Sequence, residues 1–388
     1  MIKDFEYIDT EDIYLDSACQ SLRPTPVIDA LLYYYQHHNS CGDRVKYKWG
    51  VNTDDKVNQT RELVLKYLKL SSRDHFVSFT LNTTYAINLI LSQINSKHVA
   101  KVMTSDMEHN SPFLSTIAYS KKNDVPREVM IREPDGSINT SGYDFRKALV
   151  VVSSTSNIDG RRLKNIDKVI DSVHRAGGVI IIDAAQTMPH SVELLHKTKA
   201  DVVCFSAHKL YAPSLGGMVV RKDFLDKIDS TFIGGGMVDD VLLDTYKLSY
   251  GNPNHVHTVF EAGLQASGEI VALGAAIQWL MGLSNADHSR LDNNADRLYS
   301  FLASKEKIAL VNNETTPTIS FYVKGIDSHL LGAALADEHI MARTGYFCAH
   351  YYLDHVKSYP PLIRFSLGYH NSSEDIDKVI RILERVVK

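Results

Sequence analysis

The chain has 388 residues, of which 44% are hydrophobic, so it is long and apolar enough for one large domain with a smaller companion. Its 42 Lys and Arg residues stand against 46 Asp and Glu residues, and the formal net charge is −4. This charge excludes recruitment of nucleic acid or of an anionic membrane by bulk attraction. No apolar stretch is long enough to span a bilayer, so we expect no membrane association.

The N-terminus and the cysteines lead us to expect a cytoplasmic protein. Residues 1–16 are acidic and mixed, without the basic start and apolar core of a signal peptide. The cysteines are scattered and form no CxxC pair, so we expect neither disulfides nor a bound metal. Cys204 lies within an apolar run and is expected to pack as an inert core residue, and Cys41 is expected to be an exposed thiol.

The first predicted elements are a short strand, a loop and a helix. Tyr14–Gln20 indicates a strand and an irregular turn before a helix that begins near Val27. Cys19 in this segment is expected to pack, with a catalytic role as the alternative. Residues 33–52 are polar and aromatic without clear periodicity, and they predict a loop that reaches toward the pocket or a partner subunit. Residues 54–70 show the spacing of an amphipathic helix.

A hydroxyl-rich turn comes next. It joins a strand at Phe76–Thr80 to a helix at Ala86–Ile94. The start of a helix offers free N–H groups and the positive end of its dipole, which together bind anions. Thr83 and Thr84 are therefore candidate phosphate ligands or N-caps of this helix, and the two roles are compatible because both use the same N–H groups.

Two short apolar runs farther along the chain, Val179–Ile182 and Val202–Phe205, are typical of buried parallel strands. Ligands of an open α/β sheet bind outside the carboxyl ends of its strands, so we expect the polar groups that follow these runs to face one pocket. These groups are Asp183, Gln186, Ser206, His208 and Lys209.

This combination matches pyridoxal phosphate. The aldehyde of that cofactor needs a lysine amine, its ring nitrogen needs a carboxylate to stay protonated, and its phosphate needs hydroxyl, imidazole and backbone donors. Lys209, Asp183 and the pair Ser206 and His208 supply these groups. Taken singly, Asp183 could cap a helix and Lys209 could be a solvated cation, but the combination favours the cofactor.

The order of elements predicts an α/β fold. Strands at 102–104 and 148–152 and a helix at 165–176 alternate as β-α-β units, which gives a mainly parallel sheet with right-handed crossovers. We predict an N-terminal segment at residues 1–25, a large cofactor-binding domain at 26–264 and a smaller α+β domain at 265–388. The remaining predicted elements are a strand at 217–220, a hairpin within 237–257, helices at 268–281, 287–304, 328–338 and 374–387, and strands at 308–311, 318–323 and 362–367.

Two motifs carry a family resemblance. The string SAHKLYAPSLGG at 206–217, with DAAQ at 183–186, resembles the class V, fold-type I pyridoxal phosphate enzymes, and most closely the Suf-type cysteine desulfurases and selenocysteine lyases. The likeness extends from about Tyr14 to the terminal helix. It implies a homodimer that acts on L-cysteine or L-selenocysteine, mobilises sulfur for iron–sulfur cluster assembly and delivers it to an acceptor protein.

The resemblance also implies roles at the cofactor. Lys209 would carry it, and His109, in a MEHH-type motif, would stack on its ring and move protons. Thr83 and Thr84 match a phosphate turn in which Asn82 replaces the usual glycine. Asn157 and Gln186 would bind the ring oxygen, and Asn157 would also contact the substrate.

The string MARTGYFCAH at 341–350 resembles the loop whose cysteine attacks the substrate sulfur. Cys348 takes that position, so the resemblance implies a persulfide on this residue and alanine as the product. Arg364 matches the arginine that binds the substrate α-carboxylate, for which its planar fork is suited. Arg343 is a second candidate, for loop geometry or substrate approach. A structural cysteine and a structural ion pair are the alternatives.

The chain departs from the family in three further places. Residues 49–52 read Trp-Gly-Val-Asn where Arg-Gly-Val-His is usual, and Leu264 replaces a threonine that reaches the phosphate of the other subunit. Tyr346 and Phe347 replace two histidines beside Cys348, which removes cations that could activate its thiol.

We therefore predict a cytoplasmic, homodimeric, pyridoxal phosphate-dependent cysteine desulfurase. The nearest alternative is another class V enzyme, such as a C–S lyase, an epimerase or an aminotransferase, in which Cys348 is not catalytic. An alternative of another class is a scaffold without cofactor that binds a sulfur-carrier partner.

Overall fold

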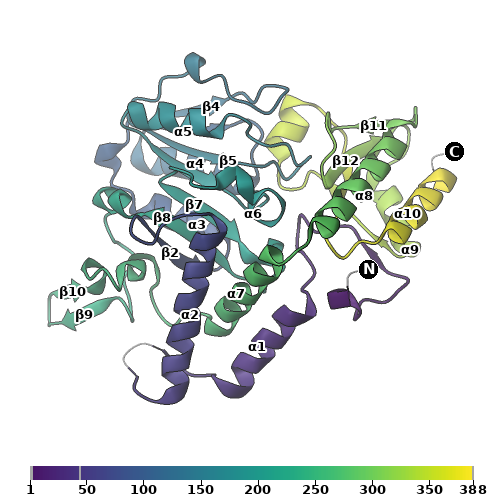
Figure 1. Cartoon of the computed structure of the whole chain (residues 1–388). Coiled ribbons are helices and arrows are strands. Elements are labelled where there is room, and N and C mark those ends of the chain that lie inside the picture. The colour runs from purple at the N-terminus through teal and green to yellow at the C-terminus, as the bar shows by residue number, and fades with distance from the viewer. Residues whose placement is uncertain (1–2, 43–44, 387–388) are drawn as a thin grey trace.

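The chain folds as two parts, each built around its own β-sheet. The computed structural model describes residues 3–42 and 45–386, and the helix α7 (Ser267–Met281) leads from the larger part to the smaller one (Figure 1). The predicted α/β class, with a large domain and a smaller α+β domain, is confirmed. The residue boundaries predicted for the domains stay predictions.

The large sheet is mainly parallel. Among the described residues it has seven strands in the order β2-β8-β7-β6-β5-β3-β4. β8 runs antiparallel to both of its neighbours, and the other pairs are parallel. The strands are β2 (His75–Thr80), β3 (Lys101–Ser105), β4 (Arg127–Met130), β5 (Ala148–Ser153), β6 (Val179–Asp183), β7 (Val202–Ser206) and β8 (Gly216–Arg221).

Both faces of this sheet are buried. In β6, Ile180 and Ile182 belong to one hydrophobic cluster, whereas Val179 and Ile181 belong to a second. Successive side chains of a strand point to opposite faces, so the sheet lies between two apolar layers. This explains why its strands are continuous apolar runs instead of alternating ones. Cys204 belongs to the second layer and is fully buried, as predicted.

Helices cover the two faces. The buried residues of α5 recur every three or four positions, so the helix packs one apolar stripe against the sheet; they are Ile166, Val169, Ile170 and Val173. The helices of the larger part are α1 (Thr25–His37), α2 (Lys48–Tyr67), α3 (Thr83–Gln93), α4 (Asn110–Asn123), α5 (Ile166–Arg175) and α6 (Thr187–His190).

The loop predicted at residues 33–52 is wrong at both of its ends, which are helical. Helix α1 continues to His37 and α2 begins at Lys48, six residues before the predicted start. Helix α1 buries only Val27 and Tyr34, so its sequence lacks the regular apolar spacing that identifies a helix. Its position depends on tertiary packing, because Tyr34 lies so close to Gly268 of α7 that an added Cβ would be 2.8 Å from its ring.

The smaller part has an antiparallel sheet in the order β11-β12-β15-β14. The N-terminal strand β1 pairs with β13 beside it, through Ile13 and Ile340. The elements are β1 (Ile13–Tyr14), β11 (Ile308–Leu310), β12 (Thr318–Val323), β13 (Ile340–Met341), β14 (Arg343–Gly345), β15 (Leu362–Ser366), α8 (Asn285–Ala303), α9 (Ser328–Asp337) and α10 (Ser373–Val386).

Helix α10 begins at a capping box. The N–H of Ser372 donates to Asp375 Oδ2 at 2.8 Å, and the N–H of Asp375 donates to Ser372 Oγ at 3.1 Å. The predicted helix end at Val387 lies outside the described residues.

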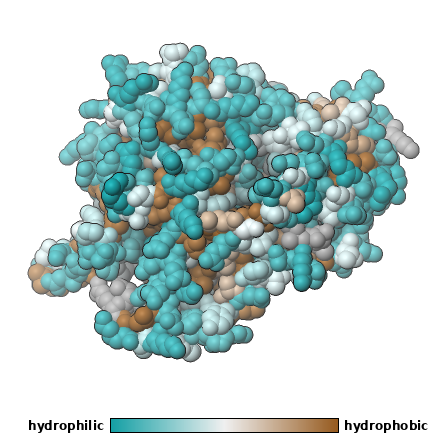
Figure 2. Space-filling model, in the orientation of Figure 1, coloured by the Kyte–Doolittle hydropathy of each residue, from teal (hydrophilic) through white to brown (hydrophobic). Residues whose placement is uncertain are grey.

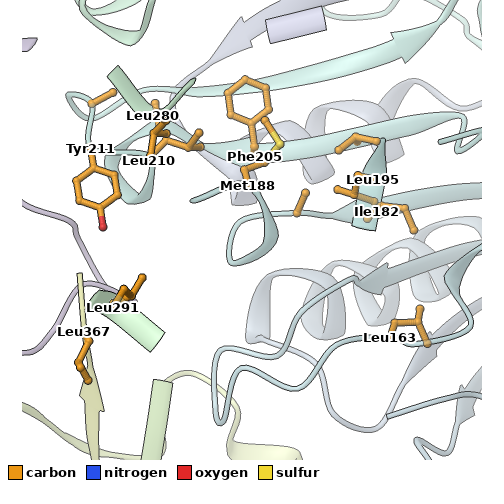
Figure 3. Close-up of a cluster of buried hydrophobic side chains, with 14 of the residues drawn as sticks. Leu163, Ile182, Met188, Leu195, Phe205, Leu210, Tyr211, Leu280, Leu291 and Leu367 are labelled. Carbon is orange, nitrogen blue, oxygen red and sulfur yellow. The ribbon is translucent and has the colours of Figure 1, made fainter. Parts of the chain in front are cut away.

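One hydrophobic cluster connects the two parts. Figure 3 shows Tyr211 pointing from the large sheet toward Leu291 and Leu367, which belong to the smaller part. The N–H of Tyr369 donates to the Tyr211 hydroxyl at 3.1 Å. Because Tyr211 follows Lys209 closely, this contact holds the lysine segment against the small domain.

An antiparallel hairpin of β9 (Val238–Val241) and β10 (Tyr246–Leu248) projects from the larger part (Figure 1). A hairpin was predicted within 237–257. Its tip is apolar and exposed at Val241, Leu242 and Leu243, and Figure 2 shows hydrophobic atoms at this end of the molecule. Across the part of the chain that the structure describes, no helix combines the length and the apolar character that crossing a bilayer requires.

Candidate functional site

All of the predicted site residues line one cavity, which has a volume of about 340 Å³. It lies where the carboxyl ends of the parallel strands face the smaller part. The predicted residues in its wall are Thr83, Thr84, His109, Asn157, Asp183, Gln186, Ser206, His208, Lys209, Arg343, Cys348 and Arg364. The structure therefore brings together residues that are separated by as much as 281 positions along the chain. Their chemical roles stay predictions at this point.

The floor of the cavity consists of strand ends. Asp183 and Ser206 are the last residues of β6 and β7, and Lys209 ends the short 3-10 turn that follows β7. Strands β6 and β7 are paired in parallel, with Asp183 beside Cys204. The parallel register therefore sets the carboxylate, the hydroxyl and the amine close together at one edge of the sheet.

Asp183 and Lys209 form the electrostatic centre of this floor. Burial raises the pKa of Asp183 to about 6, although the Ala185 N–H at 2.9 Å and the Lys209 amine favour its ionised form. Burial also lowers the pKa of Lys209 below its ordinary value, while Asp183 opposes this shift. Among the described residues, none accepts a hydrogen bond from the Lys209 amine, which leaves its nitrogen available within the cavity.

The hydroxyl-rich turn forms one end of the cavity. Ser206 Oγ accepts from the Thr83 N–H at 3.1 Å and lies 2.6 Å from Thr83 Oγ1, which joins the start of α3 to the end of β7. Thr84 Oγ1 lies 2.6 Å from Ser111 Oγ. The predicted N-capping by a threonine is wrong, because Asn82 Oδ1 accepts from the Tyr85 N–H and caps α3. The residue that replaces the usual glycine thus supplies the cap.

Gly216 allows this turn to approach the sheet. A Cβ added at Gly216, the first residue of β8, would lie 2.4 to 2.6 Å from the backbone of Asn82. A side chain there would push away the start of α3, whose first N–H groups and dipole favour an anion. The close contact therefore shapes the anion-binding end of the cavity.

His109 and His208 are neutral imidazoles in this environment. Burial, together with Lys209 and Arg364, lowers the pKa of His109 to about 3. Its Nδ1 accepts from the Ser111 N–H at 3.0 Å and caps α4. Burial and Lys209 lower the pKa of His208 to about 4. Both rings therefore act near pH 7 as uncharged groups.

The N-terminal segment closes another side of the cavity. Gln186 Nε2 donates to the Ala18 carbonyl at 2.7 Å. Ser21 Oγ donates to the His208 carbonyl and accepts from the Tyr211 N–H. These bonds hold residues 18–21 against the lysine segment, and Cys19 lines the cavity between them.

The two predicted arginines share a carboxylate that the sequence analysis missed. Asp16 pairs with Arg364 at 3.1 Å and with Arg343 at 2.7 Å. Arg364 also donates to the Asn157 carbonyl, yet its Nε has no partner although the residue is only 3% exposed. The place of Asp16 within Tyr14–Gln20, the segment that also carries Cys19, was the available signal.

Cys348 lies on an exposed loop whose backbone is held from both sides. Asn157 Nδ2 donates to the Phe347 carbonyl at 2.6 Å, and the Asn110 N–H donates to the Cys348 carbonyl at 2.6 Å. Phe347 and Cys348 have φ of 47° and 56°, in the left-handed region that non-glycine residues seldom adopt. The ring of Phe347 covers the guanidinium of Arg364 at 4.9 Å. The loop thus presents the Cys348 side chain while Phe347 anchors it.

Two side chains singled out in the sequence lie at the surface. Cys41 is exposed, as expected, and Leu264 is 79% exposed. In the described ranges, no His, Cys, Asp and Glu side chains gather in a group that could hold a metal ion.

This donor set fits pyridoxal phosphate. A buried carboxylate, an amine without a hydrogen-bond partner and a helix start next to hydroxyl groups match its ring nitrogen, aldehyde and phosphate. The buried unpaired Nε of Arg364 indicates that an acceptor is missing from the same cavity, and a carboxylate would satisfy it. The site can therefore hold an amino acid next to the cofactor.

Comparisons with known proteins agree with this geometry. The model of the aminotransferase class-V family matches residues 13–379. A protein named probable cysteine desulfurase, from Pyrococcus abyssi, is 26% identical over 97% of this chain and 95% of its own length. A probable cysteine desulfurase 1 from Mycobacterium leprae is 27% identical over 97% of this chain, which spans 62% of that longer protein.

A solved structure is similar over the same range. The apo cysteine desulfurase from Thermococcus onnurineus NA1 superimposes with a TM-score of 0.87 at 26% identity, covering 97% of this chain and 95% of that one. The enzymes of the matched family depend on pyridoxal phosphate.

Proposed function

Because this chain belongs to the aminotransferase class-V family, we propose that it is a pyridoxal phosphate-dependent cysteine desulfurase. It converts L-cysteine to L-alanine and transfers the sulfur to Cys348. One observation carries the proposal: Lys209, Asp183, Arg364 and Cys348 line a single cavity, although they come from both parts of the molecule.

The floor of the cavity holds the cofactor. Lys209 Nζ would bind its aldehyde, Asp183 would pair with its ring nitrogen, and His109 would stack on its ring, since all three residues line the cavity. Thr83, Thr84, Ser206 and His208 would hold the phosphate, and Gln186 and Asn157 would bind the ring oxygen. When bound, pyridoxal phosphate supplies an electron sink that weakens the bonds of the substrate.

The chain's own side chains bind the substrate and move its protons. Arg364 binds the α-carboxylate, for which Asp16 and the Phe347 ring orient the guanidinium. Lys209 Nζ, whose pKa burial lowers, accepts a proton from the substrate and returns it to the substrate carbon. Cys348 Sγ attacks the substrate sulfur, so the carbon–sulfur bond breaks and a persulfide forms on Cys348.

We further propose that the chain forms a homodimer in the cytoplasm and passes sulfur to an acceptor protein. The dimer is supported by exposed apolar residues at the hairpin tip and at Leu264. Light scattering of the purified protein tests it, with a mass of twice one chain as the expected result.

The test of the activity is product analysis. Pure protein loaded with pyridoxal phosphate is incubated with L-cysteine and a thiol reductant, and alanine, sulfide and pyruvate are quantified together. We expect alanine and sulfide in equal amounts. Pyruvate in place of alanine would identify a C–S lyase, and the absence of all three products would refute the proposal.

A further inference from the structure

The cavity contains a second thiol that the proposed function leaves unused. Cys19 lines the same cavity as Cys348 and Lys209, and it is partly exposed. Both sulfur atoms lie near enough to the Lys209 amine to affect its pKa. Packing was the expected role of Cys19, yet a thiol that faces the reacting groups is not enclosed in the core.

Cys19 also has a cationic partner. Arg343 Nη2 donates to Cys19 Sγ at 2.6 Å, and the same guanidinium is held by Asp16 at 2.7 Å. A guanidinium that donates to sulfur stabilises an anionic sulfur more than a neutral thiol. In contrast, no described residue donates a hydrogen bond to the Cys348 sulfur, which lies on the exposed loop.

An independent observation indicates that a ligand occupies the space between these groups. Arg364, which shares Asp16 with Arg343, is 3% exposed and has an unpaired Nε in the same cavity. A buried guanidinium N–H without an acceptor is costly, so the substrate carboxylate belongs there. A substrate held on Arg364 lies next to the pair formed by Arg343 and Cys19.

We propose that Cys19 is a second sulfur acceptor that takes the sulfur from Cys348, an inference that rests on the proposed desulfurase activity. The thiolate of Cys19 forms a bond to the outer sulfur of the Cys348 persulfide. The sulfur–sulfur bond of that persulfide then breaks, and its electron pair leaves with Cys348 as a thiolate. The Cys348 thiolate takes up the proton that the transferred sulfur releases, because a persulfide is a stronger acid than a thiol, so atoms and charge balance and neither oxidant nor reductant is needed.

The positive charge of Arg343 favours transfer of sulfur from Cys348 to Cys19. A persulfide anion on Cys19 is paired with Arg343, whereas on Cys348 it has no hydrogen-bond donor among the described side chains. Transfer returns Cys348 to its reactive form, so it can attack a second substrate molecule. The enzyme then stores sulfur at a position less exposed than the loop.

The test measures where sulfur is bound. Holoenzyme is incubated with L-cysteine without reductant and quenched by alkylation, and the peptides are analysed by mass spectrometry while alanine is quantified in the same sample. We expect an added sulfur atom on both the Cys19 and the Cys348 peptides. Total sulfane sulfur per chain should be roughly twofold higher in the wild type than in Cys19→Ser, in which only Cys348 can be loaded.

Two variants help to distinguish a failure of the proposed sulfur transfer from a failure of the proposed desulfurase activity. Cys41→Ser is the matched control, because this exposed thiol lines a different cavity, and its sulfur content should equal that of the wild type. Cys348→Ser should leave Cys19 unmodified, and sulfur on Cys19 in that variant would contradict the relay. Alanine with sulfur on Cys348 alone, or a disulfide between the two cysteines, would overturn the role of Cys19 but not the desulfurase activity. Absence of alanine would instead refute the proposed function.

Discussion

The floor of the cavity and the Cys348 loop differ in how their geometry arises. Asp183 and Ser206 stand at the ends of buried parallel strands, so the sheet register positions them. Phe347 and Cys348 instead have left-handed backbone conformations that hydrogen bonds from Asn157 and Asn110 hold. The difference suggests a division of work, in which a rigid floor binds the cofactor and a strained exposed loop takes the sulfur. Changes in the two regions should therefore have different signatures.

The largest effect is expected at Lys209. Lys209→Ala removes the amine that binds the cofactor aldehyde and moves protons, so alanine formation should fall to background. The absorbance of the lysine-bound cofactor should disappear with it, which a spectrum of the purified variant reports. If the variant has the same spectrum as the wild type, the proposal that Lys209 binds the cofactor is contradicted.

Cys348→Ala should abolish alanine formation as completely as Lys209→Ala does, because the loop then lacks the thiol that takes the sulfur. The floor stays intact, because no side-chain bond from Cys348 supports Asp183 or Lys209 among the described contacts. Cofactor absorbance should therefore be retained, in contrast to Lys209→Ala. Loss of the cofactor from Cys348→Ala would show that the two regions do not act separately.

Asp183→Asn should lower the turnover number by roughly 10²- to 10⁴-fold, because the ring nitrogen loses the carboxylate that keeps it protonated. Wild type serves as the reference for cofactor spectrum and rate. A decrease of less than tenfold would mean that Asp183 does not pair with the ring.

The same substitution should change the pH dependence of stability. Burial raises the pKa of Asp183 to about 6, so the folded chain binds a proton that the unfolded chain has lost between about pH 4 and pH 6. Without cofactor, the free energy of unfolding should decrease across this window as pH rises, by up to about 3 kcal/mol. Asp183→Asn should remove this decrease, which urea titrations at several pH values measure. An unchanged pH dependence would contradict the assigned burial effect.

The smallest effect is expected at Phe347. Its ring lies 4.9 Å from the Arg364 guanidinium, and Phe347→Leu loses about 0.5 to 1 kcal/mol of cation–π attraction. KM for L-cysteine should rise roughly two- to fivefold, with the cofactor spectrum unchanged. Tyr346→Leu is the control, since it lies on the same loop without a ring contact to Arg364. An equal rise in both variants would indicate a general disturbance of the loop.

The predictions from sequence succeeded where one element alone determines the position of a residue. Continuous apolar runs located β6 and β7, and the polar residues after them located the floor. Apolar spacing located most of α2 in the same way. Arg364 and Cys348 were assigned to the site by their likeness to family motifs. The strand ends of the large sheet could not identify them, because both residues lie far along the chain in the smaller part.

Features that depend on tertiary contacts were missed. The end of helix α1, residues 33–37, was taken for a loop, since only Val27 and Tyr34 are buried along this helix. The cap of α3 was assigned to a threonine, although Asn82 makes that bond. Asp16 joins two arginines from different strands, and its pairing with Arg343 and Arg364 follows from the packing of the N-terminal segment on the small sheet.

The most direct test of the division between floor and loop is to add L-cysteine to holoenzyme of Cys348→Ala. The absorbance of the cofactor and the yield of alanine are recorded in the same cuvette, beside wild type. We predict that L-cysteine shifts the cofactor absorbance of the variant as it does in the wild type, while no alanine forms. Alanine at the wild-type rate would contradict the account, because sulfur would then leave the substrate without Cys348.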